Sequence, residues 1–292
     1  MMSWYPAFRL AQWMGEVLPV ELGYRLAERL EDAWRWLSPN DRRGVRANLS
    51  AVCDGRAEDA APAAREVFRN FGRYLLEFLT VHRQAPMVFT VSGYDHVVRA
   101  SQGGRGVIML TGHFGNWELG AVALSRMGFP MSVVALSHRD PRLTRLFDRQ
   151  RRRCGIDVIP LGPEASPRCV AALRQGRVLG IVGDRDFGSE GVSVSLLGRP
   201  VTVPRGPATF SLRTGAPLIA CFMERTGRWR FHFHIDPPLY PTRDAGASEE
   251  VLRLTQAYVA AFERYIRRCP AQWVLFRPFT PPLRAGFTEP VR

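Results

Sequence analysis

The sequence contains no lysine. All 40 of its basic residues are arginine, against 27 acidic residues, and the formal net charge is +13. Enzymes that hold pyridoxal phosphate as a Schiff base and nucleotide hydrolases with a P-loop both need a lysine at the reacting group. These two classes are therefore excluded. The same absence excludes a protein kinase, although "SHRD" at 137–140 and "DFG" at 186–188 resemble kinase motifs.

Cysteine is scarce, and its spacing has no pattern. The five cysteines never occur as CxxC; they are Cys53, Cys154, Cys169, Cys221 and Cys269. Scattered cysteines of odd number favour reduced thiols over a disulfide framework or a zinc cluster. We therefore expect no structural metal.

Long uninterrupted apolar runs are missing from the N-terminal third. Residues such as Arg9, Glu16 and Pro19 interrupt it before any run approaches the roughly 18 residues of a membrane span. Helical patterns cover 5–36, 40–52 and 57–83, and the first of them is rich in tryptophan and arginine, which suit a membrane–water interface. We predict that residues 1–84 form a helical region that attaches peripherally to a membrane surface. Packing of this amphipathic region on its own domain is the alternative.

From about residue 87, short β-rich apolar runs alternate with helical patterns. Such alternation is typical of a largely parallel sheet that helices cover on both faces. With 292 residues and 46% hydrophobic composition, the chain is long enough for a sizeable core. The sequence predicts an α/β fold with a largely parallel central sheet and an N-terminal helical extension. Residues 85–292 would form one continuous core.

The stretch "VIMLTGHFGNWELGAVAL" at 107–124 places His113, Asn116 and Glu118 at the end of an apolar run. Residues five apart diverge on a helix and on a strand, so His113 and Glu118 meet only across a strand–turn–helix. Glu118 would then orient the imidazole, and His113 would act as a general base. A histidine held in a turn for structural reasons is the alternative. Metal ligation is less favoured, because no third ligand stands nearby.

The segment "TGHFGNWELGA" resembles the HxxxxD/E block of the bacterial lipid A biosynthesis acyltransferases, within the lysophospholipid and glycerolipid acyltransferase superfamily. Other segments resemble further parts of the same family, in order along the chain. They are "NLSAV", "YLLEFL", "LFDRQRRRCGIDVIPLG", the block from "LRQGRVLGIVGDRDFG" to "RTGAPLI", and "CPAQWVLF". The family commonly has DQD where this chain has Asp184-Arg185-Asp186, and this form is similar to the phosphatidylinositol mannoside acyltransferase branch.

The resemblance implies a glycerolipid acyltransferase-like fold and acyl transfer from a thioester on coenzyme A or acyl carrier protein. The acceptor would be a hydroxyl of an anionic lipid or glycolipid, of the lipid A precursor or phosphatidylinositol mannoside type. It implies that His113 deprotonates the hydroxyl, that Glu118 orients His113, and that backbone N–H groups or an arginine near Arg151 stabilise the oxyanion. No cofactor is needed, because the thioester is already activated. The enzyme would work at the cytoplasmic face of the bacterial inner membrane.

Four arginines share one face of a predicted helix over 141–153: Arg142, Arg145, Arg149 and Arg152. This row is either a solvated basic face or a grip on phosphate or an acidic carrier protein. Asp184 and Asp186 either pair with nearby arginines or support the histidine and the acceptor. The residues assigned to substrate binding are Asn116, Arg142, Arg149, Arg151, Asp184, Arg185 and Asp186.

Two other functions compete with acyl transfer. The high charge and the aromatic content fit a protein that binds nucleic acid, but no RNP-like, KH or zinc signature accompanies them. A membrane-surface scaffold without catalytic activity is the second rival, against which the intact HxxxxE argues. Nucleic acid is therefore not an expected partner.

Overall fold

The computed structural model describes residues 5–53, 57–82, 87–185, 191–242 and 246–280. Its α-helices are α1 (Tyr5–Val17), α2 (Val20–Leu37), α3 (Pro39–Val52), α4 (Ala57–Leu79), α5 (Tyr94–Gln102), α6 (Trp117–Arg126), α7 (Pro141–Arg153), α8 (Ala165–Arg174), α9 (Gly206–Thr214) and α10 (Ala247–Arg268). Its strands are β1 (Val88–Ser92), β2 (Val107–Thr111), β3 (Met131–Ala135), β4 (Asp157–Pro160), β5 (Val178–Val182), β6 (Val192–Leu196), β7 (Arg199–Val203), β8 (Leu218–Gly227) and β9 (Arg230–Ile235). A short 3-10 helix, η1 (Pro270–Gln272), follows α10.

The central sheet has seven strands in the order β1-β9-β8-β2-β5-β3-β4. All neighbouring pairs are parallel except β8 and β9, which form an antiparallel hairpin. β6 and β7 pair with each other outside this sheet. The predicted α/β fold with a largely parallel sheet is confirmed.

Alternate residues of β2 point to opposite faces of the sheet, and each face is covered. Ile108 and Leu110 belong to a core shared with α8, α9 and α10, whereas Val107 and Met109 belong to one shared with α5 and α6. Every one of these four side chains is buried. This two-sided burial explains why the run reads as continuously apolar rather than alternating.

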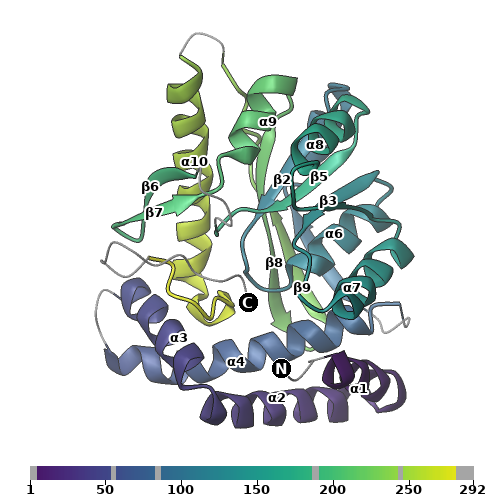
Figure 1. The fold of residues 1–292 in the computed structure, drawn as a ribbon, viewed down its shortest axis with the longest axis vertical. Helices are drawn as coiled ribbons and strands as arrows, with labels where there is room; N and C mark the ends of the chain where they lie inside the picture. The colour runs from purple at the N-terminus through teal and green to yellow at the C-terminus, as the bar shows by residue number, and fades with distance from the viewer. Residues whose placement is uncertain (1–4, 54–56, 83–86, 186–190, 243–245, 281–292) are drawn as a thin grey trace.

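The N-terminal helices gather at one end of the sheet, at the bottom of Figure 1. α4 runs across the carboxyl end of β2 and packs against α2 and α3. The single helix expected over 5–36 is two helices, because Pro19 cannot continue α1 and stands instead at the start of α2. α5 and β7 were not predicted from the sequence. Among the described residues, no helix combines the length and apolarity that crossing a bilayer requires.

Candidate active site

The turn between β2 and α6 carries the histidine of the motif. Gly115 in this turn has φ +60°, and a Cβ there would lie 1.9 Å from the carbonyl oxygen of Met223 in β8. A residue without a side chain is therefore required for the turn to pass this close to β8. Asn116 caps α6 by accepting a hydrogen bond from the backbone N–H of Leu119 at 3.2 Å. The predicted strand–turn–helix is confirmed.

Asp184, which follows β5, binds His113 through both of its oxygens. One oxygen lies 2.7 Å from His113 Nδ1, and the other accepts the backbone N–H of His113 at 2.9 Å. The indole N–H of Trp273 donates to the same carboxylate at 3.2 Å. Burial acts to raise the pKa of Asp184, but the contacts with His113 and Trp273 outweigh it and hold the pKa below its ordinary value. An ionised carboxylate at Nδ1 fixes the proton there and leaves Nε2 as the basic nitrogen.

This geometry corrects the contact predicted between Glu118 and His113. The carboxylate at His113 Nδ1 belongs to Asp184, and Glu118 is instead bound by Arg151 of α7. Asp184 lies 71 residues after His113 and reaches it because β5 is the neighbour of β2 in the sheet. The spacing within the HxxxxE motif could not reveal Asp184, because only the order of the strands brings it next to His113.

The Glu118–Arg151 ion pair is buried and joins α6 to α7. Arg151 donates from Nε to one Glu118 oxygen at 3.1 Å and from Nη2 to the other. Its Nη1 donates to Asp148 at 3.2 Å. Burial acts to lower the pKa of Arg151, but the Glu118 carboxylate raises it above the ordinary value. The guanidinium is therefore engaged with carboxylates on both sides.

A cavity of about 1250 Å³ lies beside His113. Its wall includes apolar side chains of the sheet and of α6, among them Met109, Leu124, Met131, Met223 and Phe233. Basic side chains also line it: Arg151, Arg185, Arg205 and Arg277. A long apolar wall combined with guanidinium groups suits an amphiphile with an anionic group.

The remaining predicted residues are distributed between the cavity and other positions. Arg185 lines the cavity, whereas Arg142 and Arg149 are exposed on α7 and do not contribute to the cavity wall. Asn116 is fully buried behind the wall, where it caps α6 and binds Glu77, so its position is that of a structural residue. Asp186 lies outside the described residues.

Sequence reasoning missed the aromatic groups around His113. Trp117 packs edge-on against the imidazole with 5.0 Å between ring centroids, and Tyr74 of α4 stacks on Trp117 at 4.1 Å. Trp273, which binds Asp184, lies in the segment "CPAQWVLF" that resembles the family. Two features of the sequence could have indicated these aromatic contacts: Trp117 stands inside the HxxxxE motif, and Trp273 stands inside "CPAQWVLF".

The chain matches the family model described as bacterial lipid A biosynthesis acyltransferase over residues 4–279. The chain belongs to the bacterial lipid A biosynthesis acyltransferase family. It is 31% identical over 220 residues to a phosphatidylinositol mannoside acyltransferase of Mycobacterium tuberculosis, covering 72% of this chain and 67% of that protein. With the phosphatidylinositol mannoside acyltransferase of Mycolicibacterium smegmatis it shares 30% identity over 244 residues, 80% of this chain and 78% of the relative.

A lipid A biosynthesis palmitoleoyltransferase of Escherichia coli is 26% identical over 227 residues, which are 75% of this chain and 71% of that protein. These relatives are all acyltransferases, and the present protein is an O-acyltransferase of the same family. The resemblance drawn from the motifs is thereby confirmed, including its link to the phosphatidylinositol mannoside branch.

Proposed function

We propose that this acyltransferase moves a fatty acyl chain from an acyl thioester to a hydroxyl of an anionic lipid or glycolipid. The acceptor is of the lipid A precursor or phosphatidylinositol mannoside type, and the donor is carried by coenzyme A or acyl carrier protein. The observation that carries the proposal is the His113–Asp184 contact at the wall of a large, mainly apolar cavity. The names of the relatives support the two acceptor types.

In the proposed reaction, His113 Nε2 takes the proton of the acceptor hydroxyl as the oxygen attacks the thioester carbonyl. Asp184 at Nδ1 stabilises the imidazolium that results, as the acid of a catalytic triad does. The tetrahedral intermediate collapses with cleavage of the carbon–sulfur bond, and the leaving thiolate takes the proton from His113. The products are an ester and a free thiol, and His113 returns to its starting state without a cofactor.

Glu118 and Arg151 have a different role in this proposal. Arg151 directs Nε, Nη1 and Nη2 at Glu118 and Asp148, so its contacts join α6 to α7 beside the cavity. Both side chains line the cavity, and the pair fixes the first turn of α6 next to His113. We therefore assign the pair to holding the shape of the site rather than to proton transfer.

The function is tested by incubating the purified protein with a long-chain acyl-CoA or the matching acyl carrier protein thioester and an anionic glycolipid acceptor. We expect release of free thiol together with a mass gain of one acyl chain on the acceptor. Lipids of cells that lack the protein should contain a species short by one acyl chain. Salt-dependent binding of nucleic acid, with neither thiol release nor a change in cellular lipids, would contradict the proposal and favour the nucleic-acid rival.

We also propose that the N-terminal helices attach the enzyme peripherally to the cytoplasmic face of the bacterial plasma membrane, where a lipid acceptor is found. Two tryptophans support the proposal: Trp13 of α1 is 60% exposed and Trp36 of α2 is 70% exposed. α1 packs against α7, whose exposed arginines would attract anionic headgroups. Phe8 of α1 lines the cavity, so this surface adjoins the site.

Replacing Trp13 by glutamate should weaken binding to anionic vesicles, because a charge takes the place of an interfacial ring. The matched control is Leu252→Glu on α10, since Leu252 is also an exposed apolar residue (46%) but lies on an element away from α1. Co-sedimentation with vesicles at low and high salt measures the effect. Equal losses in both variants would show that binding does not run through α1.

A further inference from the structure

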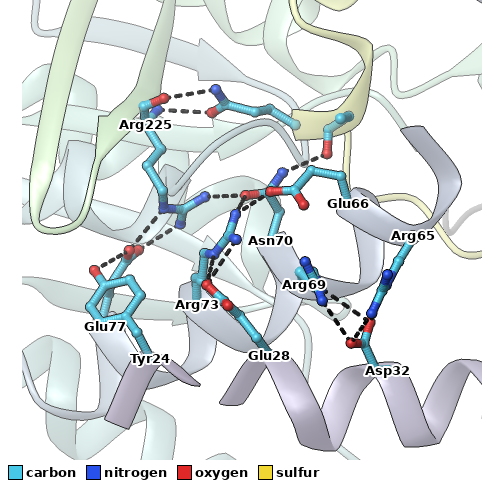
Figure 2. A network of polar contacts seen from close by, with 12 residues as sticks. Tyr24, Glu28, Asp32, Arg65, Glu66, Arg69, Asn70, Arg73, Glu77 and Arg225 are labelled. Atoms are coloured by element: carbon cyan, nitrogen blue, oxygen red, sulfur yellow. Dashed lines mark hydrogen bonds and ion pairs between the residues drawn. The ribbon is translucent and has the colours of Figure 1, made fainter. Parts of the chain in front are cut away.

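A buried ion pair lies behind the catalytic turn (residues 112–116), outside the cavity wall. Glu77 of α4 is fully buried, and Arg225 of β8 is nearly so. Arg225 donates from Nε and Nη2 to the two Glu77 oxygens at 2.8 and 2.6 Å. The hydroxyl of Tyr24 in α2 adds a third hydrogen bond to Glu77 at 2.7 Å, as Figure 2 shows. Three elements distant in sequence therefore meet at one carboxylate.

The ion pair holds the end of the catalytic turn that leads into α6. Asn116 donates from Nδ2 to Glu77 at 2.7 Å, while its Oδ1 caps the helix through Leu119. Its backbone N–H is bound by the carbonyl of Met223 in β8 at 3.0 Å. The N-cap residue of α6 is thus fixed by a side chain that α4 supplies.

The backbone of Arg225 is also linked to the middle of the catalytic turn, through η1. The Gln272 side chain accepts the backbone N–H of Arg225 at 2.8 Å and donates to the Arg225 carbonyl at 2.9 Å. The Gln272 carbonyl in turn accepts the N–H of Gly115 at 2.9 Å. Two residues further along, Val274 donates its N–H to the His113 carbonyl at 2.7 Å. Both routes converge on the residues that flank His113.

Stability alone is a weak reason for such a pair. Removing two charges from water costs free energy that their attraction often does not recover, and an apolar replacement of equal volume is frequently as stable. A buried ion pair instead fixes the orientation of the polar side chains around it, because each of them must hydrogen-bond to a particular atom of the pair. Asn116 and Tyr24 donate to Glu77, and Arg225 donates to the Oδ1 of Asn70 in α4 at 2.9 Å.

We propose that Glu77 and Arg225 are positioning residues of the acyltransferase, which set the place of the catalytic turn from behind. This rests on the proposed function of His113 as general base. A reacting group displaced by about 1 Å can cost on the order of 100-fold in rate. Tyr24 of α2 and Glu77 of α4 thereby connect the N-terminal helices to the catalytic turn.

The test separates the link to Glu77 from the helix cap. Serine at 116 still caps a helix but is too short to replace the amide donor toward Glu77, whereas alanine loses both contacts. We expect Asn116→Ser to lower kcat about tenfold or more with little change in the KM for the thioester, and Asn116→Ala to do no better. Glu77→Gln, which keeps the size of the side chain but not its charge, should lower kcat in the same way. Steady-state kinetics and circular dichroism check these results.

The matched control is Asp32→Asn. Asp32 of α2 binds Arg65 and Arg69 of α4 at 2.7 and 2.8 Å, so it joins the same two helices, but at the other end of the polar network from Glu77 and Arg225 (Figure 2). We expect this variant to lose thermal stability and keep its kcat. If Asn116→Ser retained the wild-type kcat, or if Asp32→Asn lost as much kcat at an equal drop in melting temperature, the positioning role would be overturned.

A second readout does not depend on catalysis. The ring nitrogens of His113 give ¹⁵N signals that the His113→Ala variant assigns among the six histidines. Asn116→Ser should shift these signals, and Asp32→Asn should leave them unchanged. If the ¹⁵N signals of His113 were unchanged in Asn116→Ser, the positioning role would be contradicted, whatever the activity of the wild-type enzyme. An inactive wild type with the expected shifts would instead refute the proposed function and leave the link between Glu77 and His113 standing.

Discussion

His113→Ala is expected to lower the rate of acyl transfer by about 10²- to 10⁴-fold, because the proton of the acceptor hydroxyl then has no base to receive it. The fold should persist, since the imidazole is 25% exposed at the wall of a cavity and is not part of either sheet core. Kinetics together with thermal unfolding measure both effects. A variant with unchanged activity and unchanged structure would remove His113 from the mechanism.

Asp184→Asn should come close to the same loss, up to about 10⁴-fold, because an amide lets Nδ1 lose its proton and so leaves the wrong nitrogen protonated. The folded-state pKa of Asp184 is depressed, so its contact with His113 is present above the ordinary aspartate pKa and is lost only as the pH falls through the lower folded value. A loss of activity between pH 8 and 5 therefore does not come from protonation of Asp184. The contrary result is an active Asp184→Asn beside an inactive Glu118→Gln, which would restore Glu118 as the orienting acid.

The second large effect concerns stability. Glu118→Leu should destabilise the protein by about 3–5 kcal/mol, because the variant leaves the buried guanidinium of Arg151 without its main partner. The double variant Glu118→Leu/Arg151→Met should recover much of that loss, since the buried guanidinium is removed together with its main partner, and the Asp148 carboxylate that loses its contact with Arg151 is partly exposed. Chemical unfolding of the two variants and the wild type gives the comparison.

Arg142→Met on the same helix is the control for this ion pair. Arg142 binds Asp140 at 2.9 Å, but its side chain is 51% exposed, and solvent screening leaves exposed pairs with little effect on stability. If Arg142→Met cost as much as Glu118→Leu, burial would not be the reason for the difference. If the double variant were no more stable than Glu118→Leu, the loss would come from packing rather than from the unpaired charge.

Local patterns in the sequence were sufficient for most of the elements and for the turn that carries His113. Short apolar runs identified the parallel strands, and "GVIMLTGHFGNWELG" placed His113 in a turn before a helix, where the structure has it. The break at Pro19 and the strand β7 escaped this reasoning. A helix pattern on both sides of a proline looks continuous, and the pairing that makes β7 a strand depends on its partner β6.

What the sequence by itself determined was the α/β class, the family and the histidine, because these depend on spacing along the chain. Only the tertiary structure decided which acid contacts His113. Asp184 and Glu118 were both available, and the choice follows from the order of strands, which brings the end of β5 beside the end of β2. The tertiary structure also decided that Glu77 and Arg225 pair, because they are 148 residues apart. Their charges require a partner only once folding buries both side chains at the same place.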